Sequence, residues 1–369
     1  MRIGRRGGLL AVGTAAMLIA GCGSNNNNGA PGGTPSSGST QAAGCAGGTL
    51  SGAGSTFQQP MELKWIAQFT AQCSNAQIDY TGDGSGAGVS LFSSGTQTFA
   101  GDDVILTSKD RPGADGRCHS LALDIPVAAG GVALTWNLPT VHSLKLSPDT
   151  IAGIFDGSIT TWNASALTQD NPGVALPSTH ISVFYRSDAS GTTAVFTGFL
   201  KDAATNWALG SGKTVNFPVG QGAAQSAGVS AGVASTTGGI TYVEQNYATA
   251  HNLPTAQVKN AGGSYVALNA ANVSTGLASL TVAPAGPDDL SAKLNFRPTD
   301  PNAYPISTVT YVITCTTYPS SVSAGTVALL KDYLTYAVTT GQQYATGLGF
   351  APLPSTLVTR DTATIAAIS

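Results

Sequence analysis

Residues 186–192 read RSDASGT, and they connect an alternating, strand-like segment at 180–185 to a helix-like segment. Four apolar residues then recur at the spacing of one helix face: Val195, Phe196, Phe199 and Leu200. The loop therefore ends at the start of a helix, where free N–H groups carry partial positive charge. Together with the arginine and the hydroxyl groups of the loop, this arrangement favours the binding of an anion.

Two further loops lie between a strand-like and a helix-like segment. Residues 52–57 read GAGSTF and precede an amphipathic helix predicted at 58–72. Residues 82–88 read GDGSGAG, follow a strand predicted at 77–81 and precede a short helix around 89–93. One such loop means little in a chain with 46 glycines. Three of them favour an anion site beyond the carboxyl ends of the strands in an α/β sheet.

Neither Gly-rich loop matches a familiar catalytic or nucleotide-binding motif. No Gly-Lys-Ser/Thr follows, which excludes a Walker A loop. Ser85 and Ser190 have Asp83 and Asp188 two residues before them, where a nucleophile elbow has glycine. A hydrolase that uses either serine would need a base, and none of the four histidines lies in a recognisable motif. Hydrolysis is therefore a disfavoured alternative.

The rest of the chain continues the alternation of strands and helices. Strands are expected at 49–53, 132–136 and 306–315, a helix is expected at 324–338, and Asp103–Leu106 follows another strand-like turn. Three side chains are assigned to the core: Trp65, Phe69 and Phe199. Trp136 and Trp162 are assigned to packing alone.

This alternation of strands and helices predicts an α/β protein of two lobes, each with a sheet flanked by helices. Lobe I is placed at 46–137 plus 304–369, and lobe II at 138–303. Two extended crossings, near Trp136-Asn137 and near Tyr304-Pro305, would join the lobes.

Composition narrows the kinds of partner. The chain is 42% apolar and only 9% charged, which suits a packed globular body. Its net charge is −3, and it becomes −6 without the three arginines near the N-terminus. A nucleic-acid partner is therefore excluded, and anion capture must depend on a local site.

The N-terminus predicts export and a lipid anchor. Arg2, Arg5 and Arg6 precede an apolar stretch at 9–20 that is too short to span a bilayer. Ile19-Ala20-Gly21-Cys22 resembles a lipobox, so 1–21 is predicted to be a lipoprotein signal peptide and Cys22 the lipidated residue, carrying palmitate. The alternative is an ordinary signal peptide in which Cys22 is incidental. Residues 22–45 form a low-complexity segment that is expected to act as a flexible tether.

Four cysteines remain: Cys45, Cys73, Cys118 and Cys315. An even number in an exported chain predicts two disulfides, and all three pairings stay open. No C-x-x-C pair is present, so we expect no metal site and no cofactor.

The three loops together resemble the phosphate-binding lipoproteins of the high-affinity phosphate ABC transporter. The stretches 151–162 (IAGIFDGSITTW) and 238–244 (GGITYVE) agree with the same family, in order and spacing. The resemblance implies a type II periplasmic-binding-protein fold that closes over one inorganic phosphate without catalysis. It also implies a monomer, lipid-anchored to the outer face of the bacterial cytoplasmic membrane, which delivers phosphate to a membrane-embedded ABC permease with its ATPase.

Matching motif to motif, the resemblance assigns roles to individual residues. The implied phosphate ligands are Thr56, Phe57, Ser85, Asp103, Arg186, Ser190, Gly191 and Thr192. Ser55 and Asp188 are implied to support them, with Asp188 holding Arg186 in place. Asp103 would accept a hydrogen bond from the phosphate itself. Because sulfate carries no proton near neutral pH, this carboxylate would reject sulfate but not arsenate.

Simpler interpretations exist for three of these residues. Asp103 could be a solvated turn residue. Arg186 could pair with Asp188 at the surface. Thr56 could be only the N-cap of the first helix, or an N-cap and a ligand donor together.

Two features depart from the family pattern. Asp102 stands before Asp103 where a small residue is usual, and a second carboxylate would weaken anion affinity unless it points away. The segment 220–228 lacks the usual Gly-Asn-Asp-Gly run, and it is expected to line the cleft. Two alternatives therefore stay open: a binding protein for another protonated oxyanion, and a surface or sensor protein that no longer transports.

Overall fold

The computed structural model describes residues 44–282 and 292–369. The predicted signal peptide, Cys22 and most of the tether lie outside these residues. None of the helices within the described ranges is long and apolar enough to cross a membrane.

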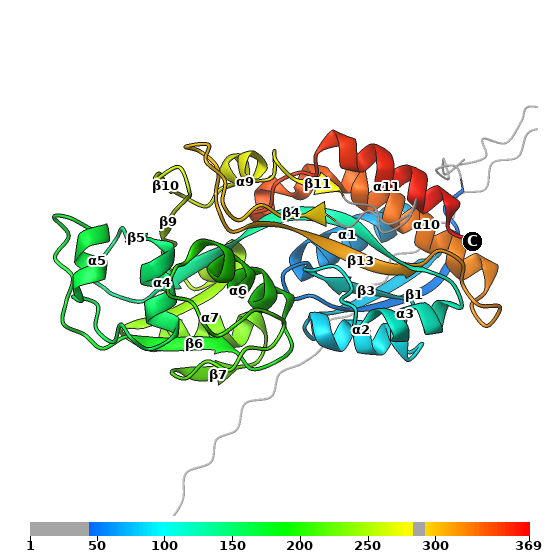
Figure 1. The fold of residues 1–369 in the computed structure, drawn as a ribbon. Coiled ribbons are helices and arrows are strands. Elements are labelled where there is room, and N and C mark those ends of the chain that lie inside the picture. The colour runs from blue at the N-terminus through cyan, green and yellow to red at the C-terminus, as the bar shows by residue number, and fades with distance from the viewer. Residues whose placement is uncertain (1–43, 283–291) are drawn as a thin grey trace, which may run out of the picture. The chain divides into compact units, whose positions relative to one another are not determined.

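An eight-stranded sheet has the order β2-β1-β3-β13-β4-β8-β6-β7 (Figure 1). Its strands are β1 (Gly48–Gly54), β2 (Ala76–Thr81), β3 (Phe99–Asp102), β4 (Ala122–Trp136), β6 (Ser182–Arg186), β7 (Gln221–Ala223), β8 (Gly239–Glu244) and β13 (Ser307–Cys315). β1 pairs in parallel with β2 and β3, so the carboxyl ends of these three strands meet at one edge. The strand near Asp103 is thus Phe99–Asp102, and Asp103 is the first residue beyond it.

Two long strands connect the two ends of this sheet. Ala122–Gly131 of β4 pairs antiparallel with β13, whereas Val132–Trp136 pairs with β8. β4 and β13 are buried along their whole length, as expected for strands covered on both faces. The ladder shifts register beside Pro126, which has no N–H to donate.

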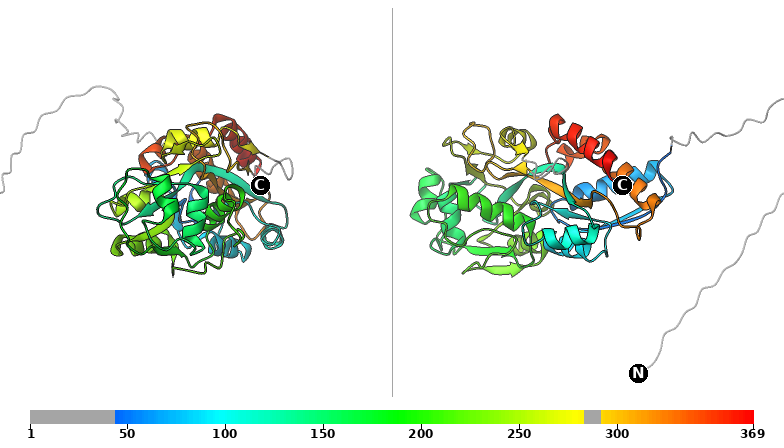
Figure 2. Two further views of the ribbon diagram at one scale, coloured as in Figure 1. Left: turned by 60° about the vertical axis from the view of Figure 1, so that its left-hand side comes forward. Right: turned by 45° about the vertical axis from the view of Figure 1, so that its right-hand side comes forward.

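Helices divide into two groups along these strands (Figures 1 and 2). Half I contains β1–β3 and the helices α1 (Gln59–Gln72), α2 (Ser85–Ser93), α3 (Arg111–Cys118), α10 (Ala324–Val338) and α11 (Ser355–Ala367). Half II contains β5–β10 and the helices α4 (Pro148–Phe155), α5 (Ser165–Asp170), α6 (Gly191–Ala203), α7 (Gln225–Ser235), α8 (Gln245–Ala250) and α9 (Ala270–Gly276). The short strands are β5 (Lys145–Leu146), β9 (Gln257–Lys259), β10 (Tyr265–Val266), β11 (Thr281–Val282) and β12 (Ala292–Lys293). Two 3-10 turns, Thr340–Tyr344 and Thr346–Leu348, follow α10.

Most of the local predictions are confirmed. The helix at 324–338 has the predicted bounds. α2 begins four residues before the predicted start, and the sequence contained no helix signal there because glycine, which occurs twice in the first turn, is a poor helix former. Each aromatic residue assigned to packing is buried: Trp65, Phe69, Trp136, Trp162 and Phe199. The assignment of two lobes stays a prediction. Its first crossing, near Trp136-Asn137, lies at the end of β4, whereas the pairing partner of β4 changes earlier, at Val132.

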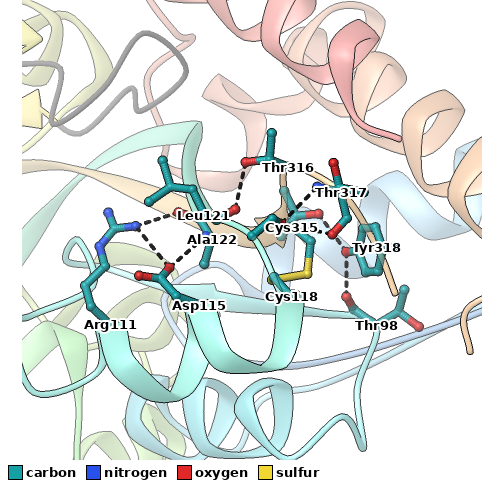
Figure 3. The surroundings of a disulfide bond; sticks show 12 residues. Thr98, Arg111, Asp115, Cys118, Leu121, Ala122, Cys315, Thr316, Thr317 and Tyr318 are labelled. Atoms are coloured by element: carbon teal, nitrogen blue, oxygen red, sulfur yellow. Dashed lines mark hydrogen bonds and ion pairs between the residues drawn. A yellow bond between two sulfur atoms is a disulfide. The ribbon is translucent and has the colours of Figure 1, made fainter. Parts of the chain in front are cut away.

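The four body cysteines form two disulfides, Cys45–Cys73 and Cys118–Cys315. The first joins Cys45, which the sequence had placed in the tether, to the end of α1. The second joins the last residue of α3 to the last residue of β13 (Figure 3). Around it, Arg111 donates to Ala122 O (2.5 Å) and Ala122 N–H donates to Asp115 (2.8 Å). The disulfide therefore fixes α3 against the central strands.

Removing Cys118–Cys315 is expected to destabilise the protein more than removing Cys45–Cys73. The two bonds close loops with sequence separations of 197 and 28, and a longer loop restricts the unfolded chain more. In the chain-entropy description the difference is about 1.7 kcal/mol. Calorimetric melting of C118A/C315A and C45A/C73A measures it. Equal melting temperatures for the two variants would contradict the expectation.

Candidate anion-binding site

The three predicted loops meet at the carboxyl ends of the strands. Ser55 N–H donates to Gly101 O (2.8 Å), and Gly84 N–H donates to Gly54 O (2.8 Å), so the first two loops lie against each other in half I. Gly86 N–H donates to Ala189 O in half II (2.9 Å). This bond brings the third loop, 186–192, against the second.

Arg186 lies at the centre of this junction, and its side chain is 1% exposed. Its Nε donates to Asp188 Oδ1 (2.8 Å), and its Nη2 donates to Asp188 Oδ2. Its Nη1 donates to the hydroxyls of Thr56 and Ser226, both at 3.1 Å. Burial acts to lower the pKa of Arg186, but the bonds and charge of Asp188 outweigh it, so the pKa is raised. The interpretation as a surface ion pair is wrong, because the guanidinium is buried.

Asp103 is 1% exposed, so the interpretation as a solvated turn residue is also wrong. Its Oδ1 accepts hydrogen bonds from Ser55 Oγ and from Thr310 Oγ1 (3.0 Å), and Ser85 Oγ lies 3.4 Å from Oδ2. Burial raises the pKa of Asp103 to about 7, and the charges of Glu244 and Asp102 add to this, although the Ser55 and Thr310 bonds oppose it. A carboxyl group with this pKa can hold or accept a proton near neutral pH.

The start of α6 faces Asp103. Ser190 is the N-cap, and its Oγ accepts from Thr193 N–H (3.2 Å). A Cβ on Gly191 would lie 2.6 Å from Asp103 Oδ2 and 2.5 Å from Ser85 Oγ, so only glycine fits here. The Thr192 hydroxyl donates to Glu244 Oε1 (2.7 Å). The Thr192 amide, in the first turn of α6, has no acceptor within 44–282 and 292–369 and remains as a donor.

The first loop contributes amides and one hydroxyl. The N-cap of α1 is Gln58, so the interpretation of Thr56 as N-cap is wrong. The hydroxyl that accepts from Gln58 N–H is that of Ser55, at 3.0 Å. The N–H groups of Thr56 and Phe57 have no acceptor among the described residues. These donors lie beside Arg186, because Thr56 Oγ1 contacts both its Nη1 and Ser226 Oγ (2.8 Å).

The structure adds residues that the sequence did not single out. Ser226 comes from the segment 220–228, in which Gln225 N–H also donates to Asp188 Oδ1 (2.9 Å). Tyr247 donates to Thr56 O (2.9 Å) across the two halves. Glu244 is 2% exposed, and its Oε2 has no hydrogen-bond partner in the described part of the chain. The sequence offered a signal for two of these residues. Glu244 ends the family-like stretch 238–244, and Ser226 lies in the altered segment 220–228.

Asp102, the unexpected carboxylate, is fully buried and paired. Lys213 Nζ lies 2.5 Å from its Oδ2. Its charge is therefore compensated inside the protein. In the described ranges, no group of three or more His, Cys, Asp or Glu side chains is arranged to hold a metal ion.

Comparisons with known proteins identify the family. Residues 39–340 match the family model of the PBP superfamily domain. The chain is 37% identical over 373 residues to the phosphate-binding protein PstS3 of Mycobacterium bovis (strain BCG / Pasteur 1173P2), covering 100% of this chain and 99% of the relative. It is 38% identical over 359 residues to phosphate-binding protein PstS 3 of Mycobacterium leprae, covering 96% and 95%. A more distant relative, phosphate-binding protein PstS of Methanocaldococcus jannaschii, is 33% identical over 79% of this chain and 78% of its own.

Solved structures share the fold. A high-affinity periplasmic phosphate-binding protein, PfluDING, aligns with a TM-score of 0.67 at 23% identity, covering 86% of this chain and 92% of its own. A phosphate-binding protein from Stenotrophomonas maltophilia aligns with a TM-score of 0.65 at 19% identity, covering 86% and 93%. The expected type II periplasmic-binding-protein fold is therefore confirmed. On the full-length similarity of its sequence, the chain belongs to the PstS family of phosphate-binding proteins within the PBP superfamily.

Proposed function

We propose that this protein captures inorganic phosphate outside the cytoplasm and delivers it to an ABC import permease with its ATPase. The observation that carries the proposal is that two side chains with complementary hydrogen-bonding roles, the donor Arg186 and the acceptor Asp103, are both buried at this junction. Arg186 supplies a permanent positive charge, and Asp103 supplies a hydrogen-bond acceptor beside the N-terminus of α6. A protonated oxyanion satisfies both groups.

The proposed ligands are Thr56, Phe57, Ser85, Asp103, Arg186, Ser190, Gly191 and Thr192. Free amides at the starts of α1 and α6 would bind phosphate oxygens. Asp188 takes two N–H groups of Arg186 and thereby fixes the plane of the guanidinium. Nη1 faces the Thr56 and Ser226 hydroxyls, and these would share it with the ligand. Ser55 would orient Asp103 through its hydrogen bond.

Asp103 would provide the selection against sulfate. Phosphate near neutral pH retains a proton that it can donate to the carboxylate. Sulfate would place two acceptors face to face in a site that excludes water, and neither would be satisfied. Arsenate also retains a proton near neutral pH and could donate it to Asp103, so this carboxylate would not exclude arsenate.

Capture would proceed without catalysis or cofactor, by closure of the two halves about β4 and β13. The contacts between the halves support closure, since Thr56 of half I bonds to Arg186, Ser226 and Tyr247 of half II. The lipid anchor at Cys22, the location at the outer face of the membrane and the monomeric state are part of the same proposal. Their support is the lipobox-like sequence and the family.

Calorimetric titration of the ligand-stripped chain from residue 23 onward, with phosphate and then sulfate, tests this function. The chain must include Cys45, because Cys73 would otherwise lose its disulfide partner. We expect one phosphate per chain, and no heat from sulfate at about pH 9, where the Asp103 carboxyl with its pKa of about 7 is ionised and phosphate still carries a proton. Absence of heat with both anions would refute the transport function. Equal responses to both anions would refute the role of Asp103.

A further inference from the structure

A buried ion pair joins the two halves beside the anion site. Lys213 lies in half II, in the connection between α6 and β7, and its Nζ is 2.5 Å from Asp102 Oδ2 at the end of β3. The Asp102 side chain is 0% exposed and that of Lys213 is 13% exposed. Asp110 Oδ2 of half I lies 3.4 Å from the same ammonium group. Lys213 thus reaches from half II to two carboxylates of half I, Asp102 and Asp110, which together are called the acidic seat.

The acidic seat needs this cation. Asp102 is adjacent in sequence to Asp103, so an unpaired Asp102 would add a buried negative charge next to the proposed phosphate site. Burial acts to lower the pKa of Lys213, but the charges of Asp102 and Asp110 outweigh it and raise the pKa. Lys213 therefore stays charged when the halves are together.

Lys213 also contacts the phosphate-binding helix through its backbone. Its carbonyl oxygen accepts from Ser190 N–H (2.9 Å), at the N-cap of α6. One residue thus holds the start of α6 with its main chain and the end of β3 with its side chain.

The seat is firmly built on the half I side. Asp110 is the N-cap of α3, and the last residue of α3 is bonded to β13 by Cys118–Cys315 (Figure 3). Arg111, the first residue of α3, pairs with buried Asp124 of β4 (2.5 Å). The acidic seat therefore moves with the central strands, and Lys213 moves with half II.

We propose that Lys213 is a closure latch, which enters the Asp102–Asp110 seat when the halves close and slows the release of phosphate. The proposal rests on the proposed function, in that closure is taken to trap phosphate. Because Asp102 and Lys213 belong to different halves, opening separates them and returns both charges to water. The latch explains why this chain tolerates a carboxylate before Asp103.

The test is a double-mutant cycle with stopped-flow phosphate release from the chain starting at residue 23. K213M removes the charge but keeps the backbone carbonyl that holds Ser190. We expect it to speed phosphate release about tenfold to a hundredfold, because a buried partner is left unpaired. D102N/K213M should release phosphate at least about fivefold more slowly than K213M, since paired groups are coupled. K213R should stay within about threefold of the unmodified chain.

K109M is the matched control, because Lys109 is an exposed lysine close in sequence to the same seat. It should leave the release rate unchanged. If K213M behaves like K109M, or if the D102N and K213M effects simply multiply, the latch is refuted.

Small-angle scattering without phosphate tests the latch independently, so failure of the latch can be told apart from failure of the proposed function. Without phosphate, K213M is expected to have a larger radius of gyration than the unmodified chain, because the closed form loses its latch. If the unmodified chain binds no phosphate, the function fails, but this difference would still support the latch. Identical scattering of the two chains would overturn it.

Discussion

Arg186→Gln is expected to abolish tight phosphate binding, weakening it roughly a hundredfold to several thousandfold. Removing one partner of a buried, hydrogen-bonded pair costs about 3–5 kcal/mol, and about 1.4 kcal/mol is a tenfold change in affinity. Here the loss is compounded, because Asp188 would remain in the site as an uncompensated negative charge facing the ligand. Calorimetric titration with phosphate measures the effect.

Two further variants make the Arg186 result interpretable. R186K keeps the charge but loses the fork that binds Asp188 and the Thr56 and Ser226 hydroxyls, so its affinity should lie between the two extremes. R297Q removes an exposed arginine and should leave affinity unchanged. A folded R186Q chain, shown by its melting curve, that binds phosphate as tightly as the unmodified chain would disprove the proposed site.

Asp103→Asn is expected to admit sulfate, raising its affinity about a hundredfold relative to phosphate. The amide offers a donor where the carboxylate offered only acceptors, so a fully deprotonated anion finds a partner at this position. Titration of D103N and of the unmodified chain with both anions at about pH 9, where the Asp103 carboxyl is ionised, gives the ratio. D79N, which changes a solvent-exposed carboxylate on β2, is the control. Discrimination that survives in D103N would assign the rejection of sulfate to another group.

The pKa of Asp103 predicts that the affinity for sulfate depends on pH. With a pKa of about 7, the Asp103 carboxyl is protonated below that pH and can then donate to sulfate. Sulfate affinity should therefore rise as the pH falls toward 7, about tenfold per pH unit, and level off below it. D103N should show no such rise. A pH-independent sulfate affinity in the unmodified chain would contradict this role of Asp103.

Much of the site was predictable from the sequence because its chemistry is local. Each of the three loops joins a strand to a helix, and helix periodicity or glycine content is visible over a few residues. Arg186 was singled out from its loop in this way, whereas Asp103 and Gly191 were assigned roles by the resemblance to the family. Their burial was not predictable, because it depends on which segments cover them, and the solvated interpretation of Asp103 failed for that reason.

Other features depended on strand order. The sequence left three disulfide pairings open, and the antiparallel placement of β13 beside β4 is what brings Cys315 to Cys118. Ser226 could not be found from its neighbours, because its partners Thr56 and Arg186 lie 170 and 40 residues away.

By itself, the sequence determined the alternation of elements, the position of the three strand-to-helix loops and the number of disulfides, and its resemblance indicated the family. The elements, the loops and the cysteine count follow from spacing and side-chain chemistry along the chain. Only the tertiary structure decided the disulfide pairing, the burial of Arg186 and Asp103, and the partner of Asp102. The last case shows the physical reason. A carboxylate that looked unfavourable at an anion site is compensated by Lys213, 111 residues away, because folding brings opposite charges together where water cannot screen them.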